Sequence, residues 1–260
     1  MFFDILTIFP DFFASPLQEG IVRRALADGR VQVGLHNIRD FATDRHHMTD
    51  DRPFGGGEGM VMKPEPLARC LQAAKRPELR SRVILLSPIG ACFDQRVAER
   101  LTSYEQLLLV CGRYEGVDER FRERYVDEEL SIGDFVLTGG ELAALVVLDA
   151  VMRLLPGVLG CGESATNDSF SCGLLKHRQY TRPREFEGMA VPEVLFSGDH
   201  AAVAQHRFLE SVQLILQRRP ELLAQVNFTK ADRKVLRRAG LLEQVEAAIK
   251  GLASEQSHAH

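Results

Sequence analysis

Short apolar segments alternate with amphipathic ones along the first 150 residues of this chain. Four segments have strand patterns: 2–9, 31–38, 83–86 and 107–111. Segments with apolar residues at helical spacing lie between them: 16–28, 66–75 and 94–101. Apolar strands separated by helices predict an α/β domain with a mainly parallel sheet. Ligands of such sheets bind beyond the carboxyl ends of the strands, so the loops at Ser87–Gly90 and Cys111–Tyr114 are candidate sites.

The pattern changes after the mostly apolar helix expected over 141–155. Residues 158–196 are rich in Gly, Ser, Thr and Pro and have almost no periodicity, which is typical of a linker. From about residue 201 the pattern is helical, with Pro220 opening a short helix and Thr229 as the expected N-cap of the next. We therefore expect an α/β domain over 1–160, a linker over 161–200, a helical domain over 201–250 and a disordered tail over 251–260.

Charge is unevenly distributed between these parts. The chain has 32 basic and 36 acidic residues and a net charge of −4, which argues against a simple polycation that coats nucleic acid. Residues 1–200 contain 23 basic and 30 acidic side chains, and residues 201–260 contain the other 9 and 6. The balance of −7 against +3 indicates two parts with different tasks.

Composition narrows the class of protein further. With 45% hydrophobic and 26% charged residues, the chain can bury a large core and is not disordered. Its start lacks the features of a signal peptide, and no apolar run is long enough to span a bilayer. The five cysteines form no CxxC motif, so reduced thiols, no metal site and a cytoplasmic location are expected.

Glycine gathers first in the segment Asp50–Met60, which contains Gly55, Gly56, Gly57 and Gly59. Such a loop lets the backbone approach a ligand closely or present N–H groups to an anion. The preceding basic cluster, which includes His46 and Arg52, suits phosphate groups. A flexible turn beside a solvated loop explains the same residues equally well.

Two further glycine-rich segments follow expected strands. Cys111–Asp118 places Gly112 and Gly116 at a strand end, with Glu115 as a candidate partner for ribose hydroxyls or an ordinary loop residue. Ser131–Glu141 is too rich in glycine for a plain strand and too apolar for a surface loop. Its free backbone groups could bind the edges of a base, and Thr138 could cap the following helix.

Taken together and in this order, these segments resemble the bacterial tRNA (guanine-N1)-methyltransferase (TrmD) family. The matching segments are Asp50–Met60, Leu109–Asp118, Ser131–Glu141, Pro156–Gly160, Ser164–Phe170 and Tyr180–Pro183. Ile8–Pro10 and Arg218–Leu223 also match, and the resemblance covers residues 1 to about 240. Phe54 and Glu58 differ from the tyrosine and proline common in the family.

The resemblance implies a fold that periodicity does not indicate. The family belongs to the SPOUT class, in which the parallel sheet of the α/β domain contains a deep trefoil knot, and a small all-α C-terminal domain follows. It implies a cytoplasmic homodimer with active sites at the subunit interface, tRNA held in part by the linker and the helical domain, and no membrane partner.

The resemblance also implies the chemistry: S-adenosylmethionine methylates N1 of guanosine at position 37 of tRNA. Asp168 matches the general base of the family, and Arg153 matches the cation that stabilises O6. Without the resemblance, Asp168 would be read as an aspartate in a turn and Arg153 as a cation at the C-terminus of a helix. Expected donor-binding residues are Ser87, Pro88, Gly112, Glu115, Ile132, Gly133, Asp134, Phe135, Val136, Leu137 and Gly140. Expected tRNA-binding residues are His46, Arg52, Gly55, Gly57 and Gly59. Dependence on Mg²⁺ is implied without a ligand set.

Three other functions remain open at this stage. Asp44, Asp50 and Asp51 could serve a metal-dependent phosphoesterase. A catalytically inactive RNA-binding dimer would bind tRNA without methyl transfer, although intact Arg153 and Asp168 argue against it. A SPOUT enzyme that methylates ribose would keep the fold but would not need the same pair of residues facing a purine.

Overall fold

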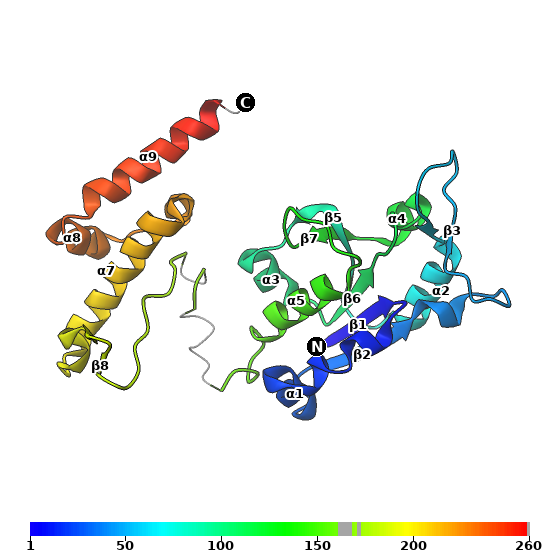
Figure 1. The fold of residues 1–260 in the computed structure, drawn as a ribbon, viewed down its shortest axis with the longest axis horizontal. Coiled ribbons are helices and arrows are strands. Elements are labelled where there is room, and N and C mark those ends of the chain that lie inside the picture. The colour runs from blue at the N-terminus through cyan, green and yellow to red at the C-terminus, as the bar shows by residue number, and fades with distance from the viewer. Residues whose placement is uncertain (161–167, 171–172, 259–260) are drawn as a thin grey trace. The chain divides into compact units, whose positions relative to one another are not determined.

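The computed structural model describes residues 1–160, 168–170 and 173–258 of the 260-residue chain. The chain forms two compact units, Met1–Gly162 and Glu163–His260 (Figure 1). Each unit has its own buried apolar core: both faces of a sheet in the first unit, and the centre of a helical bundle in the second.

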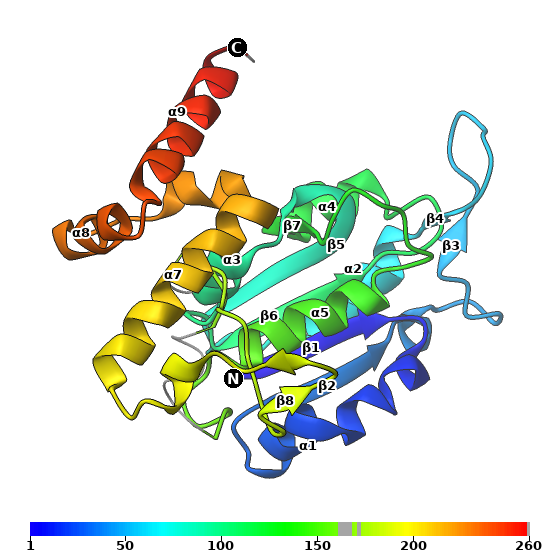
Figure 2. The same ribbon diagram turned by 60° about the vertical axis from the view of Figure 1, so that its left-hand side comes forward.

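A five-stranded parallel sheet forms the centre of the first unit, in the order β2-β1-β6-β5-β7 (Figure 2). Its strands are β1 (Phe2–Thr7), β2 (Gln32–Asn37), β5 (Ser81–Cys92), β6 (Gln106–Cys111) and β7 (Glu128–Ser131). Every residue of β6 is buried, as its continuous apolar sequence predicts. The expected α/β fold with a parallel sheet is confirmed.

Helices cover both faces of this sheet. They are α1 (Gly20–Ala27), α2 (Pro64–Ala74), α3 (Gln95–Leu101), α4 (Glu119–Tyr125) and α5 (Glu141–Met152). Because successive strand residues point to opposite faces, Leu107 and Leu109 share a core with α1, α3 and α5. Leu108 and Val110 face the other way and share a second core with α2 and α4.

Two segments of the first unit depart from their expected boundaries. The helix expected over 16–28 is divided into a 3₁₀ turn η2 (Pro16–Gln18) and α1, because Glu19 is extended and Gly20 has a φ of +56°. Strand β5 does not end at Leu86 but continues to Cys92, with a register shift against β7 between Leu86 and Ala91. The shift places Ser87–Gly90 outside the regular ladder.

Short elements complete the first unit. They are the 3₁₀ turns η1 (Pro10–Phe13) and η3 (Ile38–Phe41) and the antiparallel pair β3 (Asp50–Asp51) and β4 (Val61–Met62). The pair β3–β4 closes the base of the glycine-rich loop between residues 52 and 60.

The second unit is mainly helical from residue 200 on. Its elements are β8 (Glu185–Phe186), β9 (Met189–Ala190), η4 (Glu193–Phe196), α7 (His200–Arg218), η5 (Pro220–Gln225), α8 (Lys230–Arg238) and α9 (Leu242–His258). Thr229 is confirmed as an N-cap, since its hydroxyl accepts the N–H of Asp232 and the Asp232 carboxylate accepts the N–H of Thr229. Val212, Ile215 and Leu236 are fully buried in its core.

The segment expected as an ordered or semi-ordered linker over 161–200 contains the short hairpin β8–β9. Helix α9 continues beyond residue 250, where we expected a disordered tail, and ends at His258. Residues 251–258 contain no proline, and alanine, leucine, glutamate and glutamine all favour continuation of a helix.

The three described cysteines, Cys70, Cys92 and Cys111, are free thiols. Burial raises the pKa of Cys70 to about 12, so this thiol stays protonated. Cys161 and Cys172 lie outside the described residues. No helix in the described ranges combines the length and apolar character needed to cross a membrane.

Candidate active site

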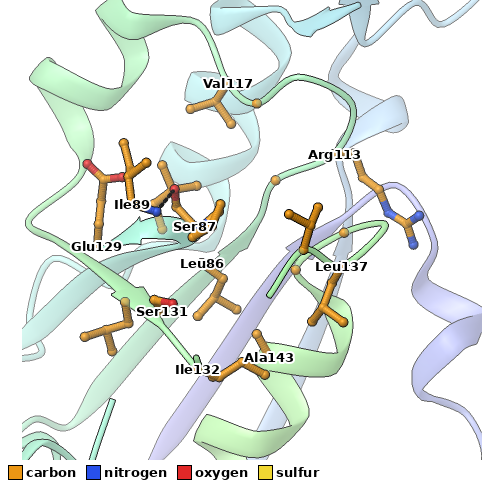
Figure 3. A pocket seen from close by; sticks show the side chains of 18 of the residues that line it. Leu86, Ser87, Ile89, Arg113, Val117, Glu129, Ser131, Ile132, Leu137 and Ala143 are labelled. Carbon is orange, nitrogen blue, oxygen red and sulfur yellow. Dashed lines mark hydrogen bonds between the residues drawn. The ribbon is translucent and has the colours of Figure 1, made fainter. Parts of the chain in front are cut away.

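A cavity of about 370 Å³ lies beyond the carboxyl ends of the three adjacent strands β5, β6 and β7 (Figure 3). Its walls are the excursion at Ser87–Ile89, the loop after β6 and the loop after β7. This is the edge at which a parallel sheet is expected to bind its ligand, and both candidate loops contribute to it.

Ten of the eleven residues expected to bind the donor line this one cavity. They are Ser87, Pro88, Gly112, Glu115, Ile132, Gly133, Phe135, Val136, Leu137 and Gly140. The eleventh, Asp134, is exposed and does not line it. Three separate segments of sequence therefore meet because their strands are neighbours in the sheet.

Close backbone contact joins the loops after β6 and β7. The N–H of Gly140 donates to the carbonyl of Gly112 over 3.0 Å. A Cβ atom on Gly140 would lie 2.8 Å from the Cα of Cys111, so no other residue fits without moving backbone. Glycine at position 140 is thus needed for packing, and the cavity wall behind it is formed by backbone.

Arg113 is fixed at the edge of the cavity by a buried acid. Its guanidinium lies 3.0 Å from the carboxylate of Glu141, which is 1% exposed and also accepts the hydroxyl of Thr7 over 2.7 Å. It also donates to the carbonyl of Thr138 and covers the ring of Phe9. Figure 3 shows the Arg113 side chain pointing away from Ser87, Ile89 and Glu129.

This network corrects the expected role of Thr138. Helix α5 has Gly140 at its N-cap position with no side-chain cap, so Thr138 does not cap it. The buried Glu141 was not singled out from the sequence. Its one signal is an acid at the start of a mostly apolar helix.

The glycine-rich loop 52–60 lies at the surface. Gly55, Gly56, Gly57 and Gly59 have φ values of +87°, +78°, +128° and +76°, which other residues rarely adopt. Phe54 at its tip is 99% exposed. The glycines therefore set the shape of the loop, and its exposure leaves it accessible to a large partner.

The base of the same loop is bonded to the loop after β6. Glu115 N–H donates to the Met60 carbonyl over 2.9 Å, and Met62 N–H donates to the Gly116 carbonyl over 2.9 Å. A Cβ on Gly59 would lie 2.7 Å from Cγ of Glu115. The expected tRNA-binding loop and the cavity are therefore adjacent, and Gly59 and Glu115 form their contact.

His46 and Arg52, the charged or polar candidates for tRNA contact, are exposed. The Asp44 carboxylate accepts the N–H of His46 over 2.9 Å and that of Met48 over 3.0 Å. Although partial desolvation opposes it, this bonding lowers the pKa of Asp44. Asp44 therefore shapes the segment that presents His46.

The two expected catalytic residues belong to different units. Arg153 is the C-cap of α5 in the first unit, in helical conformation and partly buried. Asp168 belongs to the second unit, is 25% exposed and pairs with Nζ of Lys176 over 2.8 Å. Residues 164–167 of its motif lie outside the described residues.

The described residues include no group of three or more His, Cys, Asp or Glu side chains that could hold a metal ion. Asp44, Asp50 and Asp51 are all described, so their arrangement does not support a metal-dependent phosphoesterase. For the same reason we assign no ligands to Mg²⁺ and derive no step through it.

A parallel sheet with a glycine-lined cavity beyond three neighbouring strands is the arrangement in which α/β proteins bind small ligands. The model of the family "tRNA (Guanine-1)-methyltransferase TrmD" matches residues 1–225. The chain belongs to this family.

Curated relatives cover nearly the whole chain. A protein of Geotalea uraniireducens is 57% identical over 236 residues, which are 91% of this chain and 96% of that protein. A protein of Geobacter sulfurreducens is 56% identical with the same coverage, and one of Geobacter sp. strain M21 is 52% identical over 95% of this chain and 100% of its own. All three are named tRNA (guanine-N(1)-)-methyltransferase.

Proposed function

We propose that this chain transfers a methyl group from S-adenosylmethionine to N1 of guanosine at position 37 of tRNA. The observation that carries the proposal is the cavity beyond β5, β6 and β7, which gathers ten of the eleven residues that the family resemblance assigns to the donor. The match of the family model over residues 1–225 supports the same activity.

The donor fits the cavity by size and by the character of its walls. A volume of about 370 Å³ lies in the range of small-molecule sites. The segment Ile132–Leu137 lines the cavity, and its backbone groups outside the bonds that Gly133 and Phe135 make within the loop would bind the edge of an adenine. Ile132, Leu137 and Ala143 would provide apolar contact for its faces (Figure 3). When bound, S-adenosylmethionine supplies an electrophilic methyl group on a sulfonium.

The reaction requires a base because N1 of guanine carries a proton at neutral pH. In our proposal the Asp168 carboxylate removes this proton while the N1–methyl bond forms and the sulfur–methyl bond breaks. The electron pair of the broken bond stays on sulfur, giving a neutral thioether. The Lys176 ammonium pairs with this carboxylate over 2.8 Å.

Loss of the N1 proton moves negative charge onto O6 of the purine. We propose that the Arg153 guanidinium donates to O6, where the interaction strengthens as this charge develops. Such selective stabilisation of the transition state is worth about 3–4 kcal/mol in other enzymes. Arg153 belongs to the first unit and Asp168 to the second, so the proposed reaction needs both units.

A homodimer and a knotted SPOUT fold are part of the proposal. Helix α5 is apolar on nearly all sides, and Leu142 and Val146, one turn apart, are 49% and 45% exposed. Phe9 and Phe12 are 45% and 41% exposed. Asp149 is also exposed on this helix, but the large apolar side chains beside it favour burial, and a second copy of the chain would provide it.

The charged and glycine-rich loops would bind the tRNA. The proposed location of the protein is the cytoplasm. The exposed loop 52–60, with Arg52 and the neighbouring His46, supports contact with tRNA because flexible backbone N–H groups and cations suit phosphates. The basic excess of residues 201–260 suits the same partner.

Transfer of labelled methyl from S-adenosylmethionine to tRNA tests the proposal. Two transcripts that differ only in guanosine or adenosine at position 37 should be compared. We expect labelling of the first alone, and digestion to nucleosides should yield 1-methylguanosine. Equal labelling of both, or label on a ribose hydroxyl, would contradict the proposal. Binding of tRNA without any transfer would favour the inactive RNA-binding alternative.

A further inference from the structure

Three glutamates line the candidate donor cavity: Glu115, Glu119 and Glu129. Two arginines, Arg113 and Arg122, also line it. The guanidinium of Arg113 is bonded to the buried Glu141 and points away from the cavity, so the charges of that pair cancel (Figure 3). Arg122 is thus the one arginine left to balance three carboxylates, and the wall on this side is net acidic.

Glu129 differs from the other two glutamates in its burial. Its side chain is 19% exposed, whereas that of Glu119 is 59% exposed. Oε1 of Glu129 lies 2.8 Å from Nε of Arg122. Its second oxygen, Oε2, is buried and has no hydrogen-bond partner. Unpartnered buried carboxylate oxygens are costly and rare, so this one calls for a functional explanation.

Arg122 cannot neutralise this wall. It is shared between two acids, since its NH1 group also lies 3.2 Å from Oε2 of Glu119. Solvent screens the charge of Glu119 more than that of Glu129, whose side chain is less exposed and whose Oε2 is buried. Glu129 therefore contributes a less screened negative charge to the cavity than Glu119 does.

The proposed reaction changes the charge of the molecule in this cavity. The sulfonium donor carries one more positive charge than its thioether product, S-adenosylhomocysteine, and the two are otherwise the same except for the methyl group. A buried negative charge stabilises the first more than the second without touching either. We propose that Glu129 acts as a specificity-determining residue that favours the cationic donor over the neutral product.

This inference rests on the proposed function, because it needs that donor in this cavity. Glu129 acts through its field and not by contact, so it is a positioning and selectivity residue and not a catalytic one. It would also favour release of the product, since the attraction is lost when the methyl group leaves.

Isothermal titration calorimetry of the full chain tests the inference with three compounds. They are S-adenosylmethionine, S-adenosylhomocysteine and sinefungin, in which an ammonium group replaces the sulfonium. In Glu129→Gln we expect affinity for the two cationic compounds to fall about five- to tenfold relative to that for S-adenosylhomocysteine, the effect of one partly screened charge. Binding of S-adenosylhomocysteine itself verifies that the cavity of the variant is intact.

Two control variants separate charge from structure. Glu119→Gln removes the same charge from the other partner of Arg122, but at an exposed position, and should change the ratio of dissociation constants less than twofold. Arg122→Gln removes the balancing cation and should shift the ratio in the opposite direction, in favour of the cationic compounds. The opposite sign is not expected from general disruption.

Each remaining outcome is decisive. Equal weakening of all three compounds in Glu129→Gln, or an unchanged ratio in both Glu129→Gln and Arg122→Gln, would overturn the inference. If the wild-type protein binds neither S-adenosylmethionine nor S-adenosylhomocysteine, the proposed function itself fails. A wild type that binds both with ratios insensitive to these substitutions leaves the proposed function standing and removes only the inference.

Discussion

Asp168 is the proposed general base of the reaction. Asp168→Asn keeps the shape of the residue but removes its ability to take the N1 proton, so turnover should fall about 10²- to 10⁴-fold. Donor affinity should change less than threefold, because the base acts on the other substrate. Single-turnover methylation and calorimetric donor binding measure the two effects.

Asp134→Asn is a matched control for this substitution. Asp134 lies in a donor-binding segment by sequence but is exposed and outside the cavity. It should change neither turnover nor donor binding by more than about twofold. Parallel losses of turnover and donor binding in Asp168→Asn would remove the role of a base.

A second acid, Asp4, stabilises the first unit through buried hydrogen bonds. It is 1% exposed on β1, with His36 Nε2 2.8 Å from Oδ1 and Gln106 Nε2 donating to Oδ2 over 2.7 Å. Arg76 also pairs with it. Burial alone would raise the pKa of Asp4, but hydrogen bonds from His36, Gln106 and Arg76 outweigh it and lower the pKa below 3.8.

The sign of this shift gives a pH prediction. A lowered pKa in the folded state stabilises the protein above pH 3.8, and this contribution is lost as the pH falls through the lower folded value. Asp4→Asn should therefore cost about 3–5 kcal/mol of unfolding free energy at pH 7. The difference from wild type should shrink toward acid pH in urea denaturation. A constant difference down to pH 3 would contradict the role of ionised Asp4.

At the scale of elements, the loop 52–60 and the cavity are joined where Gly59 meets Glu115. Gly59→Ala and Gly55→Ala place a side chain at similar φ values, +76° and +87°, so the backbone strain is nearly matched. A Cβ at Gly59 displaces Glu115, whereas a Cβ at Gly55 meets nothing within 4 Å. We expect Gly59→Ala to weaken donor binding about tenfold more than Gly55→Ala.

Titration of S-adenosylmethionine into both variants measures this difference. Similar tRNA affinity in the two variants would localise the effect to the cavity. Equal donor affinities would instead show that displacing Glu115 has no effect on the donor.

Elements with strong apolar periodicity could be predicted from sequence, whereas short charged ones could not. β6 and α3 lie almost as expected, because their buried residues follow the periods of a strand and a helix. β7 was missed because it has four residues, two of them acids, and its burial comes from pairing with β5. α4 could not be predicted because Phe121 is its one buried residue and most of the others are charged, so the helix shows no apolar periodicity.

The segments that form the walls of the cavity could be predicted from the sequence, but not every side chain that lines it. The glycine-rich segments identify the walls, since close backbone approach requires glycine at positions such as 140. Glu129 could not be singled out, because nothing in the sequence distinguishes it from Glu128. Glu128 instead pairs with Arg82 and Arg100.

At the scale of the whole molecule, the two units should be separable. Among the described residues, the buried members of both cores of the first unit all lie within residues 3–158. We expect a fragment of residues 1–162 to unfold cooperatively and to bind S-adenosylmethionine within about fivefold of the full chain. It should not methylate tRNA, because Asp168 is missing. Loss of donor binding in a folded fragment, judged by circular dichroism and calorimetry, would contradict this.

The exposed face of α5 gives a prediction about assembly. Leu142→Arg combined with Val146→Arg places two charges on that face and should convert a dimer to monomers in sedimentation velocity experiments. Leu145, also on α5 but packed against the core, offers the conservative control Leu145→Met. An unchanged sedimentation coefficient in the double variant would exclude this face as the dimer interface.

The strand order has a consequence for the time at which the protein becomes functional during synthesis. β1 and β2 emerge first but pair at one side of the sheet, while the cavity lies over β6, β5 and β7. Its last wall, with Gly140 and Ala143, is more than 130 residues after the first strand. A growing chain therefore cannot hold a methyl donor until more than half of it has been made. Such long-range closure also favours slow folding of the first unit.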